Sequence, residues 1–262
     1  MTTLSEAREL IATTALPAVE RFMADAPAAG TGLPTFDPLK DQTLVIGSDI
    51  VSFTVGVEAD FRQAIADSAL FAQLAALHKV GDKADPMDFF DAYFAALMGL
   101  GWIVQSRNTS SLDTKQDGFD VHEAIIGVVT AALGPIKGAL DAVLIVLNGL
   151  HKMAADAPFI TLFNKRSARE KIGKFQCTGV SHDPAHGLVA QVAAFGLMAD
   201  QVITQILFFK LEKHQTSLRS SVGELSIDTE ALKGIKPNLA AKVQAYRNAF
   251  VADTELGPVD QG

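Results

Sequence analysis

Hydrophobic positions in this chain repeat at helical spacing in some segments and alternate in others, so the pattern divides it into helices and strands. Residues 3–24 have one apolar face and predict an amphipathic helix, with Thr3 or Ser5 as its N-cap. The next segment, 25–42, is rich in proline and glycine and predicts a linker.

The following hundred or so positions predict two strands and a helical hairpin. Residues 43–57 are rich in Val, Ile, Phe and Thr, and Gly47-Ser48-Asp49 divides them into two short strands or one bulged strand. Helices are predicted over 58–78 and 87–100, with Asp85 as N-cap and Pro86 in the first turn of the second helix. A short strand over 102–107 and a polar turn follow.

A second helical hairpin is predicted over 121–155, and it is unusually apolar. Residues 124–150 contain two charged side chains, Lys137 and Asp141. Gly134-Pro135 breaks the segment into two helices, each too short to span a bilayer. Either the rest of the protein or lipid must therefore cover them.

The last third of the chain changes to alternating hydrophobic positions. After a basic stretch that we interpret as a linker, residues 172–228 predict a β-meander, which a helix over 228–256 closes. The four strands of this meander are expected at 174–181, 188–196, 201–213 and 218–228. The third strand is apolar on both faces, which is typical of a central strand with helices above and below.

This order of elements predicts an α/β (α+β) protein with a mostly antiparallel sheet. Helical hairpins are expected on both faces of the sheet, so that residues 1–262 form a single three-layered domain.

Charge and cysteine content exclude several classes of protein. The net charge is −8, and nucleic acid is therefore not the expected partner, because phosphate binding needs clustered Lys and Arg. With one cysteine, no internal disulfide can form. The N-terminus lacks the basic and apolar regions of a classical signal peptide. We therefore leave the location open between the cytoplasm and membrane association after release by a non-classical route.

Candidate chemistry is sparse. Cys177 is either a small buried hydrophobe or a nucleophile and site of S-acylation. His182 and His186 are weak metal-ligand candidates in a turn, where a loop pair without function is the simpler interpretation. Scattered acids such as Asp49 are interpreted as surface residues or caps. Phosphate-binding loops, GxSxG and HExxH are absent from the sequence, and we expect no metal and no enzymatic motif.

The element order, the hairpin at 121–155 and the run GKFQCTGVSHDPAHGLVAQVAAFGLMADQVITQILFFKLE resemble two related groups, the Cyt-type cytolytic δ-endotoxins and the Evf-like bacterial virulence factors. The first resemblance implies a protein that inserts into or assembles on lipid without an enzymatic reaction. The second implies a fatty acid held as a thioester by a cysteine in an apolar cavity. In this chain any such acylation would fall on Cys177.

We therefore expect a toxin-like or virulence-associated protein that interacts with membrane or lipid through its apolar hairpin. The expected contact residues are apolar positions of the hairpin and basic positions after it: Ile125, Val129, Leu133, Leu140, Leu144, Leu147, Lys165, Arg166 and Arg169. Two alternatives stay open. One is a fatty-acid or small-molecule binding protein or enzyme with a cavity near Cys177, and the other is a homo-oligomeric interaction protein.

Overall fold

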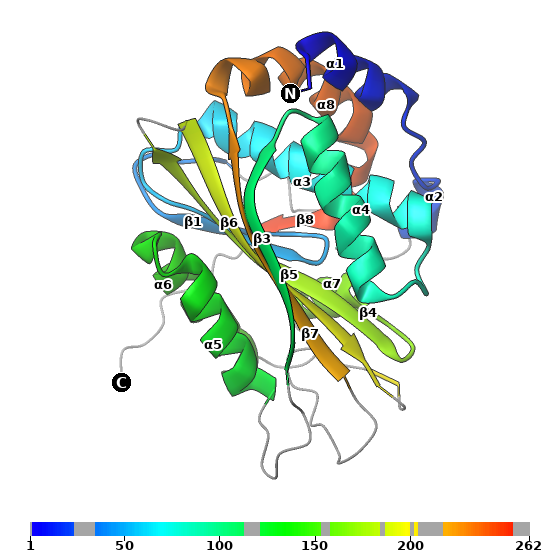
Figure 1. Ribbon diagram of the computed structural model, residues 1–262, viewed down its shortest axis with the longest axis vertical. Coiled ribbons are helices and arrows are strands. Elements are labelled where there is room, and N and C mark those ends of the chain that lie inside the picture. Colours follow the sequence, from blue (N-terminus) through cyan, green and yellow to red (C-terminus); the bar gives the residue numbers. More distant parts are fainter. Residues whose placement is uncertain are drawn as a thin grey trace.

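A mostly antiparallel β-sheet separates two layers of helices (Figure 1). The computed structural model describes residues 2–23, 35–112, 121–152, 158–183, 187–199, 202–203 and 217–253. The strands are β1 (Gln42–Ile46), β2 (Asp49–Phe53), β3 (Ile103–Leu112), β4 (Ala168–Arg169), β5 (Ile172–Asp183), β6 (Gly187–Met198), β7 (Ser217–Ile227) and β8 (Val251–Asp253). Their order in the sheet is β3-β7-β6-β5-β2-β1-β8, and β4 pairs with β5 beside this path. The predicted α/β fold with a mostly antiparallel sheet is confirmed.

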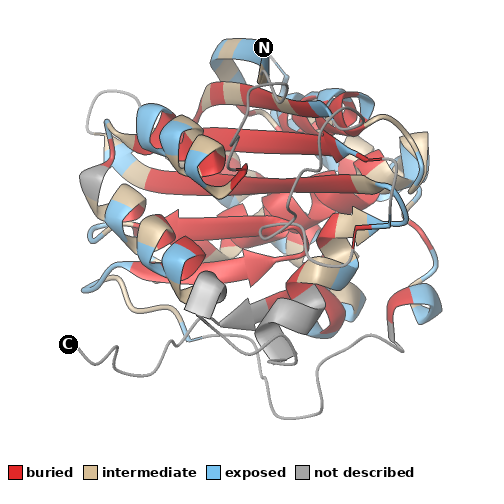
Figure 2. Ribbon diagram, turned by 90° about the horizontal axis from the view of Figure 1, so that it is seen from below, coloured by how far each residue is buried: buried red, intermediate tan, exposed pale blue. Residues whose placement is uncertain are grey.

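Helices cover both faces of this sheet, as predicted. The helices on one face are α1 (Leu4–Thr13), α3 (Ala59–Val80), α4 (Pro86–Gly99) and α8 (Thr229–Phe250), with the short α2 (Glu20–Met23) beside α8. The other face is covered by α5 (Val121–Leu133) and α6 (Lys137–Lys152), and α7 (Pro158–Ser167) packs at the start of β5. Figure 2 shows the strands buried along most of their length between these layers.

Local capping chemistry fixes where the helices begin. Thr3 and Glu6 form a capping box, because the Glu6 backbone N–H donates to the Thr3 hydroxyl and the Thr3 N–H donates to the Glu6 carboxylate. Asp85 caps α4 by accepting the N–H of Met87 at 2.8 Å, directly before Pro86. The N-caps expected at Thr3 and Asp85 are therefore confirmed.

The turn between β1 and β2 joins the sheet to α3. Gly47 has φ of +62°, and as first residue of a two-residue turn it fits the type II′ hairpin, which favours glycine there. The side chain of Gln73 on α3 accepts the N–H of Ser48 at 3.1 Å and donates to the carbonyl of Ile46 at 2.7 Å. The predicted break at Gly47-Ser48 is therefore a hairpin turn, and it yields the first of the two expected forms, two short strands.

Among the described strands, β2 and β5 form the parallel pair, with Asp49 opposite Gln176 and Ile50 opposite Cys177. The remaining described pairings are antiparallel. This pair joins the N-terminal hairpin to the C-terminal meander and thereby makes one continuous sheet.

Three predicted boundaries were wrong. The first helix ends at Thr13, and Pro17 lies in the non-helical segment before α2, because proline lacks the N–H that an inner helical turn needs. The strand predicted over 102–107 continues to Leu112. Its polar end is tolerated because β3 is an exposed edge strand. The final helix ends at Phe250, and Val251–Asp253 pairs with β1 instead of extending the helix.

The expected meander also needs correction. The basic stretch is not a linker, because Lys165 and Arg166 belong to the last turn of α7. The strand predicted at 201–213 lies almost wholly outside the described residues, and β6 pairs directly with β7. The central place expected for that strand is therefore occupied by β6, which has β5 and β7 as neighbours.

Candidate functional site

The apolar hairpin packs with one side against the sheet. Ile125, Val129, Leu133 and Leu147 are at most 1% exposed, and they join the strands in one buried cluster. Leu140 and Leu144 lie half-buried at its margin. The turn at Gly134-Pro135 separates α5 from α6, as predicted. The six apolar residues expected to contact lipid therefore form or border the inner surface of the hairpin in this structure.

The outer side of the same hairpin combines polar, small and apolar residues. Ile145 is 54% exposed and the small residues Gly127 and Ala131 are exposed, whereas the half-buried Ile126 and Val128 pack against the inner cluster. Glu123 and Asp141 are the exposed acids of this layer. On the opposite face of the protein, α8 exposes the charged Glu230 and Lys233 and the polar Asn238, Gln244 and Asn248. The α5–α6 layer differs in exposing a large apolar side chain, Ile145, beside its polar residues.

Cys177 lies on β5 beneath this hairpin and is fully buried. Its strand neighbours Ile50 and Ala193 are also buried in the cluster that α5 and α6 cover. Burial raises the pKa of the Cys177 thiol well above its usual range, and the nearby charge of Asp49 raises it further. The neutral thiol is a poor nucleophile, and its acylation stays a prediction, as does a fatty-acid or small-molecule cavity beside it.

A buried polar group on the other face of the sheet was missed by sequence reasoning. Asp49 is fully buried, which corrects its interpretation as a surface residue or cap. Its carboxylate accepts hydrogen bonds from Gln176 Nε2 at 2.6 Å and from Thr178 Oγ1 at 3.0 Å. Desolvation raises the pKa of Asp49 to about 7, and the two hydrogen bonds oppose this rise. The signal available in the sequence was an acidic residue beside a short run of apolar, strand-forming residues.

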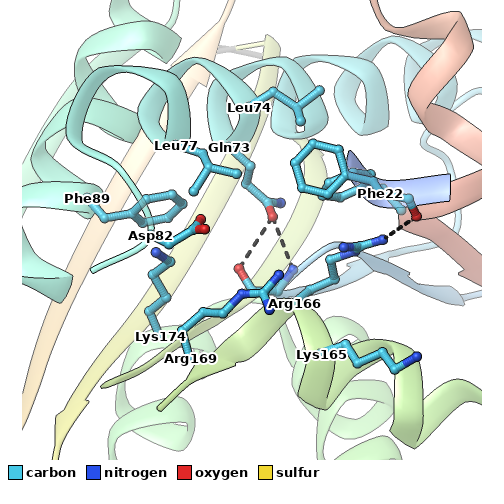
Figure 3. Close-up of a pocket in the computed structure, with 12 residues that line it drawn as sticks. Phe22, Gln73, Leu74, Leu77, Asp82, Phe89, Lys165, Arg166, Arg169 and Lys174 are labelled. Atoms are coloured by element: carbon cyan, nitrogen blue, oxygen red, sulfur yellow. Dashed lines mark hydrogen bonds between the residues drawn. The ribbon is translucent and has the colours of Figure 1, made fainter. Parts of the chain in front are cut away.

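The predicted basic residues come together at the end of the sheet where β5 begins. Lys165, Arg166 and Arg169 line one pocket with Lys174, which projects from β5 (Figure 3). Arg166 donates to the backbone carbonyls of Phe22 and Ala249 and so fastens α7 to the opposite helical layer. Lys165 and Arg169 are exposed to solvent. Within the predicted basic cluster, Arg166 therefore has a structural role, whereas Lys165 and Arg169 lie at the surface.

Of the two candidate histidines, the described part of the chain includes His182. His182 is exposed at the end of β5, and His186 lies outside the described residues. Within the ranges that the structure describes, no cluster of three or more His, Cys, Asp or Glu side chains is arranged to hold a metal ion.

Comparisons with known proteins give little beyond the fold. No family model matches the chain, and no curated protein matches it significantly. Among solved structures, the chain is similar to "Structure of the Evf virulence factor", with 11% sequence identity, 90% of each chain covered and a TM-score of 0.29. This weak likeness agrees with the Evf-like part of the resemblance but carries no argument about the site. It does not extend to the Cyt-type toxins, for which the resemblance has no support.

Proposed function

We propose that this protein engages lipid surfaces through the α5–α6 hairpin, which leaves the sheet and lies in the interfacial region of the bilayer. One observation carries the proposal. A helical layer whose inner side is apolar and packed on the sheet also exposes Ile145, at 54%, together with the small residues Gly127 and Ala131. Apolar surface that a helix leaves exposed can be buried in the interfacial region of a bilayer.

Helix length determines how the hairpin would sit in the membrane. In the described part of the chain, no helix is both long and apolar enough to cross a bilayer. The hairpin helices contain 13 and 16 residues. About 20 apolar residues are needed to span the hydrocarbon core, so these helices fit an orientation along the interface.

Burial in acyl chains would offset the apolar contacts that the hairpin loses when it leaves the sheet. Leaving the sheet would expose the inner side of the hairpin, and burial in acyl chains returns roughly 25 cal/mol per Å² of apolar surface. The outer side adds a gain that the packed state does not have. The net charge of −8 opposes approach to an anionic bilayer, and the exposed Arg169 supplies positive charge at one end of the sheet that favours it.

A reversible disulfide can test whether the hairpin must move. A Cβ atom at Gly138, at the start of α6, would lie 3.4 Å from Cγ of Asp41 in the segment before β1. The double variant Asp41→Cys/Gly138→Cys therefore places two thiols close enough to be bridged, and the buried Cys177 does not compete. We would measure dye release from neutral and anionic liposomes at neutral and acidic pH, before and after reduction.

The proposal requires release by the wild type and by the reduced double variant, with the oxidised double variant inactive. Each single cysteine variant serves as a control, because Asp41→Cys also removes the acceptor of the Val55 N–H. Equal release by oxidised and reduced forms, or no release by the wild type under any condition, would overturn it.

A further inference from the structure

The pocket at the start of β5 has the character of an anion site (Figure 3). It lies between the α3–α4 hairpin, α7 and the β1–β2 turn. Its cavity volume is about 40 Å³. That is more than one water molecule needs and too little for an acyl chain. A compact group of a few heavy atoms fits it.

Lys174 is the unusual member of this pocket. The residue is 6% exposed, and its Nζ has no hydrogen-bond partner among the residues that the structure describes. The ammonium lies 4.4 Å from the centroid of the Phe89 ring, which closes one side of the pocket. A buried charged group without a hydrogen-bonded partner costs stability, so its presence here points to a ligand that completes it.

The surrounding charges add to that of Lys174. Burial, together with the positive charges of Arg169 and Arg21, lowers the pKa of Lys174 to about 8. Asp82, an acid in the pocket lining, forms an ion pair with Arg21. Glu170, next to Arg169 in sequence, pairs with Lys83 at 2.8 Å. These acids are engaged elsewhere, and the potential at the Lys174 ammonium stays positive.

We propose that this pocket binds the phosphate group of a phosphomonoester, with Lys174 as its buried ligand and Arg169 at its exposed mouth. A tetrahedral oxyanion matches the size of the space and the convergence of cationic donors. The apolar rings of Phe22 and Phe89 accommodate the carbon side of the ester. The pocket opens on the α3–α4 side of the sheet, whereas the α5–α6 hairpin covers the opposite face. Occupancy of the pocket therefore does not depend on movement of the hairpin.

Calorimetric titration can test this site with inorganic phosphate and glycerol phosphate as probes, in the absence of vesicles. We expect Lys174→Met to weaken binding at least tenfold. Lys171→Met, which removes an equal charge from an exposed position three residues away, should change the dissociation constant less than twofold. Because Lys174 loses its proton near pH 8, wild-type affinity should fall between pH 7 and pH 9.

The pH profile of the wild type keeps the test decisive even where the variant folds poorly. Binding that does not weaken from pH 7 to pH 9, equal binding by Lys174→Met, or no binding of either probe would each overturn the proposal. A second arm compares vesicles with and without phosphatidic acid. Binding to these vesicles that exceeds binding to glycerol phosphate assigns the phosphate to a lipid headgroup, and the reverse assigns it to a soluble ester. If phosphate does not bind in this pocket, the liposome experiment on the disulfide-locked hairpin still tests the proposed function.

Discussion

Asp49 on β2 and Gln176 on β5 face each other across the parallel strand pair, and the Gln176 amide donates to the Asp49 carboxylate at 2.6 Å. This contact satisfies an acid that is wholly removed from water. The other titratable groups that interact with this acid are Tyr93 from α4 and Cys177 on the same strand as Gln176, and the charge of Asp49 raises the pKa of both. Burial therefore disfavours the ionised form of Asp49, and the hydrogen bonds from Gln176 and Thr178 compensate only in part.

Stability should consequently fall as pH rises from about 4 to about 7. The pKa of Asp49 is 3.8 in a solvated chain and about 7 in the fold, so folding favours the protonated form. The stabilisation is complete below the lower value and is lost above the higher one, for a total of about 4 kcal/mol. Asp49→Asn should remove much of this dependence and raise the urea midpoint at pH 8, while Asp60→Asn at an exposed position should not. An unchanged pH profile in Asp49→Asn would contradict the assignment.

Lys174→Met should stabilise the ligand-free protein. Because burial lowers the pKa of Lys174 from 10.5 to about 8, the folded state disfavours its charged form. The destabilisation is full below pH 8 and disappears as pH rises to 10.5, so the variant should gain up to about 3 kcal/mol at neutral pH. Thermal melts at pH 7 and pH 10 measure this difference. A lower melting temperature at pH 7 would show that the ammonium already contributes to folding.

Ile145→Asp should weaken liposome binding by roughly tenfold or more, because a fully buried Ile side chain contributes about 1.5–3 kcal/mol. Stability should change little, since this side chain is 54% exposed. Asn148→Asp, at an exposed position on the same helix, adds the same charge without removing apolar surface. Co-sedimentation with liposomes separates the two effects. Equal loss in both variants would indicate simple charge repulsion.

Cys177 should report the position of the hairpin. In solution a maleimide should label it slowly, because the residue is fully buried and its thiol stays protonated. Movement of α6 away from β2 and β5 would uncover it, so labelling should accelerate when liposomes are added. Peptide mass analysis of timed samples gives the rate. Protection that is the same with and without liposomes would mean that the hairpin stays on the sheet.

The ion pair between Asp67 on α3 and Arg247 on α8 should hold these helices together, because the Asp67 side chain is 2% exposed and the Arg247 side chain 11%. Arg247→Met leaves the carboxylate buried without its partner and should cost about 3–5 kcal/mol. Asp67→Asn/Arg247→Met should recover part of that loss. Urea unfolding of the three proteins tests this order, and a double variant less stable than Arg247→Met would contradict it.

Elements marked by local chemistry could be predicted from the sequence. Asp85-Pro86 begins a helix, Gly134-Pro135 ends one, and Gly47-Ser48 turns a hairpin, because each depends on neighbouring backbone geometry. The parallel pairing of β2 with β5 could not be predicted, since it depends on contacts between segments more than a hundred residues apart. The basic residues were visible in the sequence as a run, but which of them would be buried and which exposed was not. Lys174 faces Phe89 on α4, whereas Lys171 points to solvent, and tertiary packing decides between these fates.

The pairing of β1 with β8 has a consequence for how the chain is made. Val251 follows its partner Ile46 by 205 residues. At 5–20 residues per second, a ribosome needs roughly 10–40 s to supply that partner. Until β5 is made, the new β1–β2 hairpin has two unpaired strand edges, and the β1 edge stays unpaired until β8 is made. Such edges are templates for association with other chains. Such long-range closure also slows folding, so a chaperone that shields this hairpin during translation should raise the yield of native protein.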